Sequence, residues 1–157
     1  MMKPSDKSGP RDTYFLDVQK ALLKANIAEP RLVIDRTRLN ANIDTLLGHL
    51  PDGMGYRIVA KSLPSLALIQ HIAERTKTDR LMTFNQPMLS ALSLAMPQAS
   101  QLLGKPLPVQ AARNYFKALP ASHSEAADNI QWLIDTPQRL VQYQALSTSL
   151  GRKLRIN

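Results

Sequence analysis

Four polar residues follow short apolar runs, at points that would lie at the ligand-binding edge of a parallel sheet. They are Lys61, Asn85, Lys105 and Asp135, and the runs before them are 56–60, 81–84, 101–104 and 130–134. In α/β sheets and barrels, ligands bind at the carboxyl ends of parallel strands, where these residues are expected. A partly desolvated lysine at a strand end can attack a carbonyl carbon. Lys61 is therefore the leading candidate, and the alternative is a surface lysine whose stem lies along the strand end.

The other three residues each have a structural interpretation beside a functional one. Asn85 precedes Pro87 and suits the N-cap of a helix, but it could also line a cofactor-binding mouth. Lys105 lies in a turn-like Gly-Lys-Pro sequence and is either a solvated lysine or a ligand contact. Asp135 could equally cap a helix or face a substrate. Lys61 and Asn85 are the two predicted cofactor-binding residues.

The sequence predicts no metal site in this chain. His49, His71 and His123 are far apart, and no pair has metal-ligand spacing. Cysteine is absent, which excludes disulfides, a thiol nucleophile and a cysteine zinc site. The glycines form no phosphate-binding loop, and the single tryptophan, Trp132, is expected in the core.

The elements that must position these residues alternate between strand and helix. Amphipathic stripes predict helices over 13–25 and from Thr37 to the Pro-Asp-Gly sequence at 51–53. Later helices are expected to begin near prolines that lie 21 to 29 residues apart: Pro64, Pro87, Pro108 and Pro137. Proline suits the first helical turn because its missing N–H has no partner there anyway. This spacing fits one strand, one helix and two loops per unit.

The alternation predicts an α/β fold with a parallel sheet, either open and doubly wound or closed into a barrel. A further strand is expected over 31–35, and 153–157 looks like the fifth strand of the later series. We expect the N-terminal part of a (β/α)8 TIM-type barrel over 13–157, with about five barrel strands. Residues 1–12 are expected to form a disordered leader.

Three segments carry a resemblance to a known family. Residues 30–35, 39–43 and 57–62 resemble the opening of the alanine racemase-like, fold type III family of pyridoxal phosphate enzymes. Segments 102–106 and 132–136 are similar to its D-serine dehydratase and D-threonine aldolase branch. After Lys61 the chain reads Ser-Leu-Pro-Ser, whereas alanine racemases proper read Ala-Asn-Ala-Tyr-Gly.

The resemblance implies that Lys61 forms the internal aldimine with pyridoxal 5'-phosphate. The substrate would be a D-amino acid, and the reaction an elimination, an aldol cleavage or a racemisation. The family's phosphate-binding and second-domain residues lie beyond the fifth strand, so this chain alone is expected to have weak or no activity. The alternative is a non-catalytic pyridoxal phosphate carrier, and a third interpretation is a basic α/β interaction module.

Composition sets the remaining expectations. With 44% hydrophobic residues, most of the 157-residue chain is too apolar to be disordered. The net charge of +8 raises the question of nucleic acid, but the basic residues are scattered and not interleaved with aromatics, so no nucleic-acid partner is predicted. Residues 1–15 contain no apolar h-region, so a secretory signal is not expected, and no apolar run approaches the roughly 18 residues of a membrane span. These features predict a cytoplasmic protein without a membrane partner, and a homodimer is possible for the full-length protein.

Overall fold

The computed structural model describes residues 12–62 and 64–157, and these divide into two units. The first runs to Leu39, and the second covers Asn40 to Asn157. The leader expected over residues 1–12 lies outside the described residues apart from Asp12, which caps the first helix. The candidate site belongs to the second unit.

The first unit contains helix α1 (Thr13–Lys24) and an extended segment that leads into α2 (Arg36–His49). The Asp35 carboxylate accepts hydrogen bonds from the Thr37 and Arg38 amides, at 2.8 and 3.1 Å, and so starts α2. The strand predicted over 31–35 is wrong. This segment pairs with no strand among the described residues, and Leu32 is 80% exposed.

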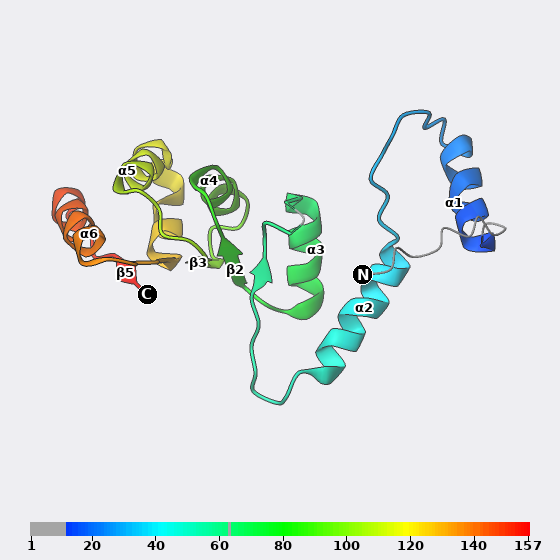
Figure 1. Ribbon diagram of the computed structural model, residues 1–157, viewed down its shortest axis with the longest axis horizontal. Helices are drawn as coiled ribbons and strands as arrows, with labels where there is room; N and C mark the ends of the chain where they lie inside the picture. Colours follow the sequence, from blue (N-terminus) through cyan, green and yellow to red (C-terminus); the bar gives the residue numbers. More distant parts are fainter. Residues whose placement is uncertain (1–11, 63) are drawn as a thin grey trace, which may run out of the picture. The chain divides into compact units, whose positions relative to one another are not determined.

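The second unit is built around a five-stranded parallel sheet in the order β1-β2-β3-β4-β5. The strands are β1 (Ile58–Val59), β2 (Arg80–Thr83), β3 (Ser100–Leu103), β4 (Ile130–Trp132) and β5 (Arg155–Ile156). They alternate with α3 (Leu66–Thr76), α4 (Gln86–Ala95), α5 (Val109–Ala118), the 3-10 helix η1 (Ala121–Asn129) and α6 (Pro137–Leu150). Figure 1 shows α3 to α6 following one another around the strands. The α/β prediction is therefore confirmed.

The strand order of the sheet differs from that of a doubly wound sheet. A doubly wound sheet reverses its strand order at a switch point. Here every strand pairs in parallel with the next one in the sequence, and the order contains no reversal. Because parallel crossovers are right-handed, successive helices in such a sheet lie on the same face. The described strands are therefore wound in one direction only.

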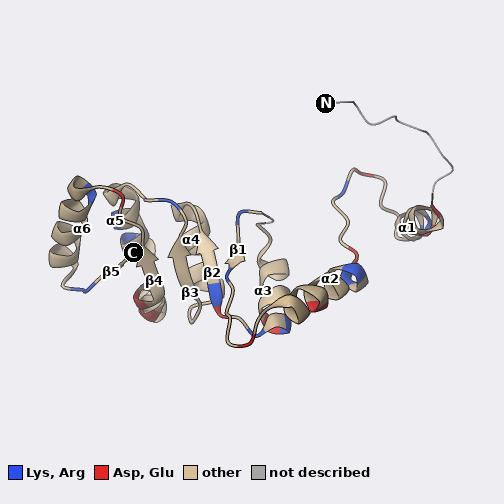
Figure 2. Ribbon diagram, turned by 60° about the horizontal axis from the view of Figure 1, so that its bottom comes forward, with Lys and Arg blue, Asp and Glu red and all other residues tan. Residues whose placement is uncertain are grey.

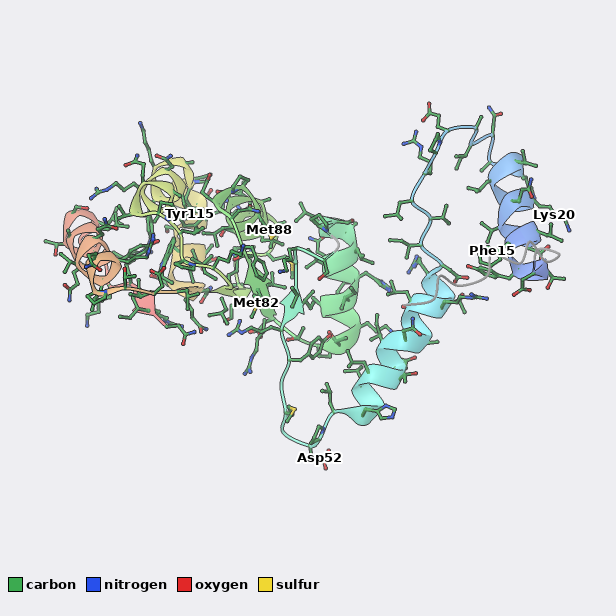
Figure 3. All side chains as sticks on the ribbon, in the orientation of Figure 1. Phe15, Lys20, Asp52, Met82, Met88 and Tyr115 are labelled. Atoms are coloured by element: carbon green, nitrogen blue, oxygen red, sulfur yellow. The ribbon has the colours of Figure 1, made fainter. Side chains whose placement is uncertain are left out.

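The core lies between this sheet and its helices, in two clusters. One gathers β3 and β4 with α4, α5 and α6 around Trp132, which is fully buried against Tyr115, Phe116 and Tyr143. The other packs Ile58, Ala60 and Leu81 against α3 and α4. Figure 3 labels Tyr115 on α5 and Met88 on α4, two of the helices that cover the sheet. Burial of Trp132 confirms that it is a core residue.

Candidate functional site

Lys61 lies at the carboxyl edge of the sheet, where the sequence placed it. The pairing of β1 continues one residue beyond the strand, since the Ala60 amide donates to the Met82 carbonyl at 3.0 Å. The chain then turns, and the Ser62 amide donates back to the Val59 carbonyl at 3.3 Å. Ala60 is buried, but the Lys61 side chain is exposed. The expectation of a partly desolvated lysine is therefore not met in this chain.

The ring of Phe84 is the neighbour of the Lys61 amine. Lys61 Nζ lies 4.4 Å from the ring centroid, within the range of a cation–π contact. Phe84 is half-buried and follows directly after β2, whereas Lys61 is the second residue after β1. Two adjacent strand ends thus bring a primary amine and an aromatic face together.

Gly104, at the end of β3, completes this edge. A Cβ atom at Gly104 would lie 2.4 Å from Phe84 Cε1, closer than two carbon atoms can approach, and 3.1 Å from Met82 Sδ, which is a tight contact. The Gly104 amide also donates to the Thr83 carbonyl at 2.8 Å. Glycine lets the Phe84 ring pack against the backbone here, because the ring occupies the volume that a Cβ would fill.

Asn85 is a helix cap, as its simplest interpretation predicts. Its Oδ1 accepts a hydrogen bond from the Met88 amide at 2.9 Å, and Pro87 lies in the first turn of α4. This satisfies one of the unpaired N–H groups at the start of the helix. Its predicted contact with a cofactor stays a prediction.

The Asn85→Ala variant is expected to be about 1 kcal/mol less stable than the wild type, because the Met88 amide loses its acceptor. Urea denaturation followed by circular dichroism measures this. The Asn85→Asp variant is the control, since a carboxylate caps a helix equally well. An unchanged urea midpoint for the alanine variant would show that the cap contributes nothing.

Lys105 and Asp135 do not join Lys61 in one group. Lys105 is exposed in the turn after Gly104. Asp135 accepts a hydrogen bond from Arg139 Nε at 2.8 Å, and the cap of α6 is instead Thr136. Asp135 therefore does not cap the helix, and its predicted contact with a substrate stays a prediction.

Arg57 is a charged residue of the sheet that the sequence analysis counted only as part of an apolar run. Its Nη1 donates to the carbonyl of Ser100 at 2.9 Å, reaching from the start of β1 across β2 to β3. Burial lowers the pKa of the Arg57 guanidinium, and the nearby positive charge of Arg80 lowers it further. The alternation of side chains along a strand, which puts Arg57 and Lys61 on one face, was the signal for it. The same Nη1 also donates to the Leu81 carbonyl of β2 at 3.3 Å, so Arg57 links the start of β1 to β2 and β3.

The histidines each have a partner outside any common cluster. His49 Nδ1 lies 2.7 Å from the Thr45 carbonyl, and His71 Nε2 lies 2.8 Å from Asn40 Oδ1. His123 Nδ1 lies 3.0 Å from the hydroxyl of the neighbouring Ser122. Within residues 12–62 and 64–157, no three His, Asp or Glu side chains gather as metal ligands would.

Comparison with known proteins adds no relative. No protein family, no curated protein and no solved structure matches the chain.

No helix in the described part of the chain has both the length and the apolar character that crossing a membrane requires. Lys and Arg side chains are spread over several elements (Figure 2).

Proposed function

We propose that Lys61 is the covalent attachment site of pyridoxal 5'-phosphate. The observation that carries the proposal is the exposed Lys61 amine at the carboxyl edge of a parallel sheet, 4.4 Å from the centre of the Phe84 ring. A primary amine is the donor that the aldehyde of this cofactor requires. The groups at this edge fit the cofactor, since Phe84 offers an aromatic face beside the amine and Gly104 leaves room for that ring.

We further propose that the chain forms the first part of a (β/α)8 barrel. The sequential order of five parallel strands supports this, because a barrel pairs each strand with the next in the sequence. The resemblance of segments 30–35 and 57–62 to the alanine racemase-like family supports it as well. In such a barrel, Lys61 would lie at the end of the barrel where the βα loops meet.

The proposed reaction is lyase, aldolase or racemase chemistry on a D-amino acid. When bound, pyridoxal phosphate supplies an electron sink that stabilises negative charge at the α-carbon. Lys61 would hold the cofactor until the substrate amine displaces Lys61. The freed amine of Lys61 would then move a proton at the α-carbon. Asn85 holds the start of α4 beside this edge through its bond to the Met88 amide.

The test is a titration of the protein with pyridoxal phosphate, followed by borohydride reduction and peptide mapping. We expect a visible absorbance band and a reduced pyridoxyl label that falls predominantly on Lys61. A label spread equally over the exposed lysines, or no band, would contradict the proposal. D-serine, D-threonine or D-alanine is then added to the loaded protein, with the L-isomers as controls. Release of product from a D-isomer would contradict the non-catalytic carrier.

A further inference from the structure

The ends of three adjacent strands form one row of side-chain positions. Val59 pairs with Met82, and Met82 pairs with Leu102, so these three residues share a face of the sheet. Side chains two residues further along a strand return to the same face. The next row is therefore Lys61, Phe84 and Gly104. Backbone bonds from Ala60 to Met82 and from Gly104 to Thr83 keep the strand ends in register up to this row.

In this row, one side of the Phe84 ring packs against Gly104. Its ring lies so close to Gly104 that a Cβ there would fall 2.4 and 2.6 Å from two ring carbons. Gly104 has no positive φ, so the effect of a side chain here would come from space and not from backbone conformation. Any larger residue at 104 must push the ring away.

The Lys61 amine contacts the same Phe84 ring. Within the described residues, no hydrogen bond or ion pair joins its amine to a carboxylate, and the Phe84 ring is its contact. A flexible lysine side chain loses conformational freedom when it is held in one place. The aromatic face of Phe84 attracts the protonated amine and so favours one position of the Lys61 side chain.

We propose that Phe84 and Gly104 form a positioning pair for Lys61, in which the ring packs against Gly104 and favours the position of the Lys61 amine beside it. The inference rests on the proposed function, since it assigns these residues to the reaction of Lys61 with an aldehyde. Phe84 and Gly104 are positioning residues, because they act through Lys61.

The test compares the Phe84→Leu, Phe84→Tyr and Gly104→Ala variants with the wild type. Phe84→Leu removes the aromatic face, and Gly104→Ala displaces it, so both are expected to lower the share of pyridoxyl label on Lys61 roughly two- to fivefold. Phe84→Tyr keeps the ring and is expected to preserve the wild-type share. Phe116→Leu makes the same change at another half-buried phenylalanine, one that packs on Trp132, and is expected to leave the share unchanged.

A second measurement does not depend on the cofactor. The ring current of Phe84 is expected to shift the NMR signals of the Lys61 ε-protons upfield in the wild type and in Phe84→Tyr, but not in Phe84→Leu. Absence of this shift in the wild type would overturn the positioning pair. Equal labelling of Lys61 in the wild type and in Phe84→Leu would also overturn it, while leaving the proposed function intact. Absence of label on Lys61 in the wild type would instead contradict the proposed function.

Discussion

Replacement of Lys61 by alanine is expected to abolish the visible absorbance band with pyridoxal phosphate and to remove the specific pyridoxyl label. Lys61 places a primary amine on the Phe84 ring at the carboxyl edge of the sheet. Alanine has no amine, and a neighbouring lysine would need to reach the same place to replace it. The variant is expected to fold, because Lys61 is exposed and its contact with the ring contributes no more than about 1 kcal/mol.

Two variants make this result specific. Lys105→Ala removes an exposed lysine after β3, at the same edge of the sheet, and is expected to keep the band and the label on Lys61. Lys61→Arg keeps a long cationic side chain but presents a guanidinium that stays protonated, so it is expected to give no band. Retention of the wild-type band by Lys61→Ala would contradict the assignment, and the labelled peptide would then show which lysine reacts.

Local signals in the sequence predicted most of the second unit. Asn85 with Pro87, and Thr136 with Pro137, mark the starts of α4 and α6, and both polar residues cap as such sequences should. Gly151 ends α6 in the left-handed conformation, with a φ of 59°, that favours glycine. Caps and strand ends depend on a few neighbouring residues, which is why a single sequence can reveal them.

Features that depend on tertiary context were not predictable in this way. The segment 31–35 has the apolar pattern of the later strands, but a strand also needs a neighbouring strand, and none of the described residues supplies one. The exposure of Lys61 depends on what surrounds the sheet edge, and the sequence does not encode that locally. The salt bridge of Asp135 with Arg139 was visible as an i, i+4 pair, but the same aspartate also fitted a cap.

The contact between Phe84 and Gly104 shows the same limit at the candidate site. The two residues are 20 positions apart and belong to different strands. No local pattern connects them, because only the register of β2 against β3 places them side by side. That register places the Phe84 ring beside Gly104, and the Lys61 amine lies over this ring.

The largest loss of stability is expected for Trp132→Ala, at about 3–5 kcal/mol. The indole is fully buried and contacts three aromatic rings, with centroids 5.5 to 6.1 Å away. Its removal from β4 would leave a cavity that the rings on α5 and α6 cannot fill without moving. Urea denaturation followed by far-ultraviolet circular dichroism is the measurement, because Trp132 is the only tryptophan and the variant loses its fluorescence signal.

Trp132→Phe separates the effect of volume from that of the indole N–H. Trp132 Nε1 is buried and has no hydrogen-bond partner among the described residues, so phenylalanine removes an unpaired donor while it keeps an aromatic ring. Trp132→Phe is therefore expected to lose much less stability than Trp132→Ala, and Val141→Ala, at a 63% exposed position of α6, is expected to lose almost none. Equal losses for the two Trp132 variants would show that the indole ring itself holds β4 against the helices. Because Trp132 belongs to the cluster on β3 and β4 and Lys61 follows β1, Trp132→Phe is also expected to leave the labelling of Lys61 unchanged.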